Sequence, residues 1–189
     1  MQAIVDGFFN PAIMQAALPL LLHGLGTTLL LCLAVVPAGL AGGLAVALLA
    51  TVRSPLLRWP LVAYVDFFRA FPPLVLLIFI YFGLPFAGWE IPPFAAVVIA
   101  FTLNTSSYYG EILRAGIESV PRGQWEAARS TGLGALGTLA YVILPQAVRN
   151  VTPDLISNTL EVAKLTGRAL PISAVAAGQL RGWPSAIFG

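Results

Sequence analysis

Long stretches without charge limit what this chain can fold into. One of them, from Gly24 to Thr51, contains no Asp, Glu, Lys or Arg, and about 20 apolar residues in a helix are enough to cross a bilayer. Hydrophobic residues make up 58% of the chain and charged residues only 10%, whereas a soluble domain has about a quarter charged residues. We therefore expect an all-α integral membrane protein, residues 1–189 forming a single transmembrane domain with about five spanning helices.

The positions of the apolar runs and of the prolines predict where these helices lie. Residues 1–20 are interrupted by Pro11 and Pro19 and are expected to form an interfacial segment. The Phe71-Pro72-Pro73 sequence should kink or restart the second span. The expected spanning segments are residues 24–51, 59–85, 91–110 and 146–170, followed by an apolar segment from Pro171 that stops at Gly189 and would be a truncated last helix.

Small residues lie in the middle of the first expected span. Gly39, Gly42 and Gly43 follow Pro37 within a few residues. Small residues let the backbones of membrane helices approach each other closely, and a proline can kink a helix. This part of the span is therefore predicted to pack tightly against a neighbouring helix.

The basic residues predict the orientation of the chain in the membrane. Cytoplasmic loops of membrane proteins carry an excess of Lys and Arg. The N-terminal tail and the loop from Leu84 to Pro93 contain no basic residue. The basic residues that follow the first and third spans are Arg53, Arg58, Arg114, Arg122 and Arg129. The N-terminus is therefore expected outside, and the stretch after the third span in the cytoplasm.

That cytoplasmic stretch, Tyr108–Pro145 with a loop at about 111–145, has the pattern of a helix, a turn and a second helix. Pro121 and Gly123 should break a helix that restarts over Gln124–Thr131. Hydropathy alone would make residues 130–148 another span, but their glycines and the Leu144-Pro145 sequence favour two short helices with a bend between them. A charged helix–turn–helix in a membrane chain is most simply a docking element for a cytoplasmic partner.

One motif in this stretch resembles a known family. The EAA loop of ABC importer permeases has a fixed spacing: Glu-Ala-Ala, three residues, Gly, nine residues, Ile, one residue and then Leu-Pro. Here Val142 stands at the Ile position, and the other motif residues are Glu126, Ala127, Ala128, Gly132, Leu144 and Pro145. The segments Tyr64–Pro73, Tyr81–Pro85 and Tyr108–Gln124 are similar to the subfamily that imports histidine, glutamine, glutamate, arginine and opines. The resemblance covers residues 20–180 of the chain.

The resemblance implies a permease subunit that couples ATP hydrolysis to import through the bacterial cytoplasmic membrane. Two such subunits, identical or different, would pair, and the helices around Glu126–Gly132 would dock in a cleft of a dimer of ABC ATPases. ATP and Mg²⁺ would bind that partner, because the chain lacks a phosphate-binding Gly-rich loop and holds no cofactor of its own. A periplasmic or extracellular binding protein would deliver a polar amino acid.

The same resemblance suggests where the substrate passes. Polar residues within spans are rare and usually face a partner or an aqueous path. For Asp66 with Arg69, and for Glu161 with Lys164, an internal ion pair and a direct role in transport are equally good interpretations. The family usually has Lys-Asp-Thr-Ser-Leu where this chain has Lys164–Arg168, which leaves the substrate's identity open. The candidate residues of the substrate pathway are Asp66, Arg69, Asn104, Glu161, Lys164 and Thr166.

Other functions fit the sequence less well. A single Cys32 and a single His23 provide neither a disulfide framework nor a metal site. The basic residues are scattered between spans, which disfavours nucleic-acid binding, and the acids are poorly placed for a membrane enzyme or channel. The alternative to a working importer subunit is a truncated homologue that no longer transports but still docks the ATPase, since the family usually has one more span.

Overall fold

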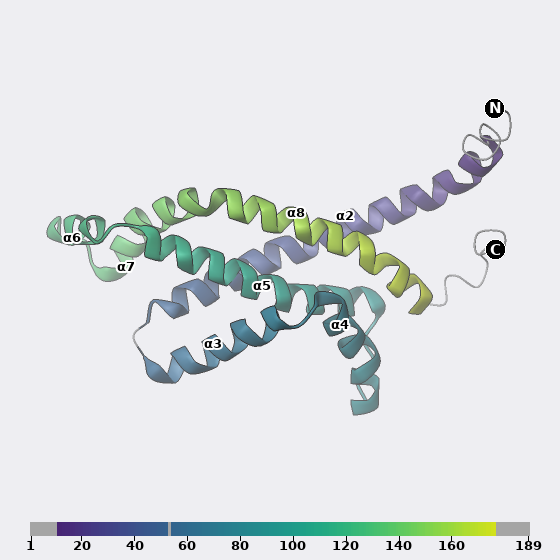
Figure 1. Ribbon diagram of the computed structural model, residues 1–189, viewed down its shortest axis with the longest axis horizontal. Helices are drawn as coiled ribbons and strands as arrows, with labels where there is room; N and C mark the ends of the chain where they lie inside the picture. Colours follow the sequence, from purple (N-terminus) through teal and green to yellow (C-terminus); the bar gives the residue numbers. More distant parts are fainter. Residues whose placement is uncertain (1–10, 53, 177–189) are drawn as a thin grey trace.

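The computed structural model describes residues 11–52 and 54–176, and all regular structure in these ranges is helical (Figure 1). The all-α part of the expected fold is therefore confirmed. The elements in chain order are α2 (Pro11–Ala50), α3 (Pro55–Ala70), α4 (Pro73–Ile78), the π-helix η1 (Phe79–Gly83), the 3₁₀-helix η2 (Leu84–Ala87), α5 (Pro93–Ser119), α6 (Arg122–Ser130), α7 (Ala135–Gly137), the π-helix η3 (Thr138–Ile143) and α8 (Leu144–Ala176).

Within the described ranges, one helical segment, Leu21–Ala50 of α2, is long and apolar enough to cross a membrane. A second qualifies if the bent pair Pro55–Ala70 and Pro73–Ala87 counts as one span. The other long helices, α5 and α8, each carry several charged residues. The total of about five spans stays a prediction, and the expected last helix after Pro171 lies mostly outside the described residues.

The interfacial segment expected at residues 1–20 is not separate from the first span. Residues 11–20 are the first turns of α2, and residues 1–10 lie outside the described part. The described part of α2 begins at Pro11. Pro19 and Pro37 both lie inside α2, so neither ends the helix as the sequence suggested for Pro19.

The Phe71-Pro72-Pro73 sequence restarts the second span, as predicted. Phe71 leaves the helix in an extended conformation, and α4 begins at Pro73. The two halves meet at 100°, so α4 points away from the direction of α3 (Figure 1). This break also removes hydrogen bonds, because Pro72 and Pro73 provide no N–H for the carbonyls of Phe68 and Arg69, four residues earlier.

Helix α5 supplies the missing donors. Asn104 Nδ2 donates to the Phe68 carbonyl at 2.6 Å, and Tyr108 Oη donates to the Arg69 carbonyl at 3.4 Å. Each of these carbonyls would otherwise lack its helical partner, and backbone groups without a partner are costly in a membrane. Two side chains of α5 thus complete the end of α3 and hold the bend in place.

The centre of the fold is the contact between α2 and α5. A Cβ at Gly43 would lie 2.5 Å from Tyr109 Cβ, and a Cβ at Gly39 would lie 2.8 Å from Thr105 Cγ2. The two backbones therefore meet at distances that only glycine permits, which confirms the predicted close packing. Helix α5 also contacts α3 and α8, and its Tyr109 hydroxyl lies 2.6 Å from Thr159 Oγ1 of α8.

The stretch 130–148 differs from the expectation of two short helices. After a bend at residues 131–134, α7, η3 and α8 follow without interruption to Ala176. The prediction that a helix ends at Leu144-Pro145 is wrong, because the preceding turn is π-helical and Leu144 N–H bonds to Leu139, five residues back. This wider turn accommodates a residue without an N–H.

We expect Gly43→Ala to destabilise the protein and Gly26→Ala to leave it unchanged or slightly more stable. Both glycines lie in α2, but a Cβ at Gly26 meets nothing within 4 Å, and alanine favours a helix. Overpacking at Gly43 should cost about 1–3 kcal/mol. Thermal unfolding of the two detergent-solubilised variants measures the difference, and equal midpoints would contradict the close approach of α2 and α5.

Candidate functional site

The charged stretch forms a turn at one end of the long axis of the molecule, at the left of Figure 1. Its first part still belongs to α5, which continues through Glu111 and Arg114 to Ser119. Val120 and Pro121 are extended and lead into α6. The loop expected at about 111–145 therefore consists of the end of α5, all of α6 and α7, η3 and the start of α8.

Helix α6 has one face on the protein and one face in solvent. Ala128 is buried, and the half-buried Trp125 packs against the apolar cluster that contains Val120 and Ile143. Glu126 and Ala127 are exposed. The helix is thus anchored by Trp125 and Ala128, while a carboxylate and a small side chain are presented at the end of the molecule.

The bend after α6 depends on the backbone of Gly132. Its φ is +87°, in the left-handed region, and a Cβ there would meet nothing within 4 Å. The requirement for glycine is therefore conformational and not a matter of space. The Gly132 N–H bonds to the Arg129 carbonyl at 3.1 Å and closes the end of α6. Leu144 and Pro145, the last residues of the motif, lie at the start of α8, half-buried and exposed respectively.

Two amide side chains of α8 tie this turn to the bundle. Gln146 Nε2 donates to Gln124 Oε1 of α6 at 3.3 Å, and Asn150 Nδ2 donates to Ser119 Oγ of α5 at 2.9 Å. Neither contact was predicted from the sequence. The spacing of Gln146 and Asn150 could have indicated a shared polar face, because residues four apart lie on the same side of a helix.

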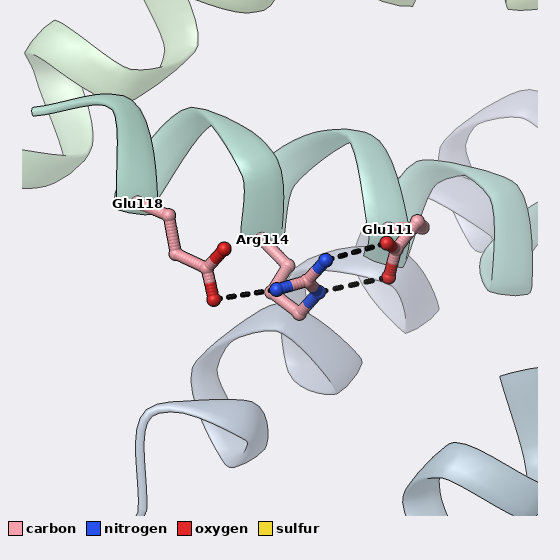
Figure 2. Close-up of polar contacts among 3 residues, drawn as sticks. All are labelled: Glu111, Arg114 and Glu118. Carbon is pink, nitrogen blue, oxygen red and sulfur yellow. Dashed lines mark hydrogen bonds and ion pairs between the residues drawn. The ribbon is translucent and has the colours of Figure 1, made fainter.

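A charged network lies on α5 beside this turn (Figure 2). Arg114 forms two hydrogen bonds with Glu111, of 2.8 and 2.6 Å, and a third with Glu118. The hydrogen bonds from Arg114 lower the pKa of Glu111, although burial acts in the opposite direction. A lowered pKa means that the stabilisation from this pair is present at neutral pH and is lost only as the pH falls through that pKa.

The network lines a cleft of about 870 Å³ between the end of α2, α3 and α5. Arg58 and Asp66 of α3 line the opposite side. Asp66 and Arg69 form no ion pair with each other, so the internal pair that the sequence left open is not present. Instead the Arg69 guanidinium lies over the Tyr108 ring, 5.3 Å from its centroid.

The six candidate residues of the substrate pathway do not form one cluster. One polar contact joins two of them, Lys164 Nζ to Glu161 Oε2 at 3.3 Å on the exposed face of α8. Asn104 and Thr166 are buried. Asn104 bonds to the end of α3, and Thr166 Oγ1 lies 3.1 Å from Cys32 Sγ of α2. Asp66 and Arg69 are exposed on α3.

We expect Asn104→Leu to destabilise the protein by about 1–3 kcal/mol, since the Phe68 carbonyl would lose its donor in a buried position. Tyr108→Phe removes the longer of the two bonds and should cost less. Thermal unfolding of both variants in detergent tests the order. A larger loss in Tyr108→Phe would contradict the assignment of Asn104 as the main donor.

Comparison with known proteins identifies the family. Residues 39–167 match the family described as binding-protein-dependent transport system inner membrane component. A probable amino-acid ABC transporter permease of Bacillus subtilis, YckA, is 39% identical over 87% of this chain and 73% of its own length. The probable glutamine ABC transporter permease GlnM of the same organism is 38% identical over 82% of this chain and 72% of its own length.

A solved structure agrees with these relatives. The crystal structure of an amino acid ABC transporter with histidines contains a chain that is 37% identical and superposes with a TM-score of 0.77, covering 85% of this chain and 75% of that one. Members of this family are membrane components and not enzymes. The chain therefore belongs to the family of inner membrane components of binding-protein-dependent transport systems, among the amino-acid ABC transporter permeases.

Proposed function

We propose that this chain is the permease subunit of an ATP-driven importer that moves polar amino acids across the bacterial cytoplasmic membrane into the cell. A dimer of ABC ATPases binds ATP and Mg²⁺ and docks on α6. A second permease subunit, identical or different, pairs with this one, and a periplasmic or extracellular binding protein delivers the amino acid. The N-terminus lies outside and α6 in the cytoplasm, as the distribution of basic residues favours.

The observation that carries this proposal is the shape of the turn around α6. Glu126 and Ala127 are exposed on a helix of nine residues at the end of the molecule, while Ala128 anchors it. A small side chain lets a partner surface approach closely, and a carboxylate offers a charge to basic groups of the partner. Gly132, with its positive φ, forms the bend between α6 and α7 and so sets the direction of α6 relative to the rest of the chain. Such a helix is suited to enter a groove of another protein.

For the substrate, the relatives named above support an amino acid, and we propose Glu161 and Lys164 as the groups that meet it. They form a single ion pair of 3.3 Å, and both side chains are more than half exposed. Charged side chains within a span usually face a partner or an aqueous path, so we place this exposed pair on the path that a ligand takes. An amino acid carries one ammonium and one carboxylate, which match this pair. Asp66 and Arg69 are proposed as further contacts along the path, and Asn104 and Thr166 as its buried supports.

The docking proposal predicts that Glu126→Lys combined with Gly132→Asp prevents association with the ATPase. The first change reverses the exposed charge, and the second places a side chain where φ is +87°. Co-purification of the ATPase from membranes should fall at least about tenfold, which corresponds to about 1.4 kcal/mol of binding free energy.

The matched control is Glu90→Lys combined with Gly134→Asp. Glu90 is an exposed acid in the loop between η2 and α5, and Gly134 has a negative φ of −65° with open space around it. This variant should bind the ATPase as the native chain does. If the native chain recruits no ATPase, or if both variants bind equally well, the proposed docking site is wrong.

A further inference from the structure

The amide pair between α6 and α8 supports an inference that rests on the proposed function and extends it. Gln146 lies in the first turn of α8 and donates through Nε2 to two acceptors, Gln124 Oε1 at 3.3 Å and the Val142 carbonyl at 2.8 Å. A side-chain amide nitrogen carries two hydrogens, so both bonds can exist at the same time. One side chain therefore connects α6 with η3.

Gln146 makes this connection where a π-helical turn and a proline interrupt the regular α-helical hydrogen bonding between α7 and α8. Leu144 N–H reaches back five residues to Leu139, and Pro145 has no N–H to offer. π-helical turns and prolines are where helices bend. A force on α6 could therefore be lost as a bend at η3 unless something braces this turn.

We propose that Gln146 is a positioning residue that fixes α6 to the π-helical turn, so that a displacement of α6 by the ATPase is passed on to α8. Its amide connects the docking helix to a carbonyl of η3 and, through its own backbone, to the first turn of α8. All three elements then move as one body.

The contacts of α8 with α5 and α2 determine which helices a displacement of α8 would reach. Asn150, one turn further along α8, bonds to Ser119 at the end of α5, so both sides of the α5–α6 turn are held by the same face of α8. Further along, α8 meets α5 at Thr159 and α2 at Thr166. Helix α8 thus connects the docking end with the middle of the bundle, within the described residues, and Gln146 lies at its entry.

The test uses the complete transporter, reconstituted with its ATPase and binding protein, carrying Gln146→Met or Gln124→Met. Methionine keeps the length of the side chain and removes the amide. The thermal midpoint should stay close to native, because Gln124 is exposed and Gln146 half-buried. Since Gln124 lies on the docking helix, ATPase association is measured for each variant and uptake is compared at equal amounts of bound ATPase. The amino acid taken up per ATP hydrolysed should fall about fivefold, the change that the loss of one typical hydrogen bond corresponds to.

Gln124→Glu is the conservative control. Its carboxylate still accepts from Gln146 Nε2, so uptake per ATP should remain near the native value. Native uptake per ATP in both methionine variants would overturn the inference and leave the docking proposal intact. An equal loss in Gln124→Glu and Gln124→Met would also overturn it, since the acceptor is retained in only one of them. A native chain that recruits no ATPase would instead refute the proposed function itself.

Discussion

The structure depends on the close approach of α2 and α5. Gly39 and Gly43 allow two backbones to meet face to face, and in a bilayer, where apolar side chains gain little from leaving lipid, such contact and interhelical hydrogen bonds are what hold helices together. Helix α5 also contacts three neighbouring helices. It packs on α2, bonds to α3 through Asn104 and to α8 through Tyr109, and its continuation beyond Tyr109 carries the charged residues that lead into α6.

This arrangement explains how one chain combines an apolar bundle with a charged end. Arg114 does not need a partner from another helix, because Glu111 and Glu118 lie one turn before and after it on α5. The helix can therefore leave the apolar region without an unpaired cation, and the polar tethers of Gln146 and Asn150 begin only where α8 starts. Apolar packing holds the middle of the molecule, and hydrogen bonds shape the end that is proposed to meet the ATPase.

Much of this could be predicted from the sequence. The restart at Phe71-Pro72-Pro73 and the close packing of the glycines of α2 each act through local chemistry, and each is found where expected. The continuity of α8 through Pro145 could not be predicted, because it depends on a π-helical turn that no residue type signals. That Asp66 and Arg69 form no ion pair could not be predicted either, because the Arg69 guanidinium lies over Tyr108, which belongs to another helix. The motif around Glu126 was readable, but its tethers to α8 required the fold.

The bend between α3 and α4 has a consequence for how such a chain can evolve. Pro72 leaves the Phe68 carbonyl without its helical donor, and Asn104, 36 residues away from Phe68, replaces it. Losing Asn104 first would leave the Phe68 carbonyl without a donor, and losing the prolines first would leave the buried Asn104 amide competing with a restored backbone donor. We therefore expect Asn104 and the Pro72-Pro73 pair to change together, because a change at one site alone is unfavourable.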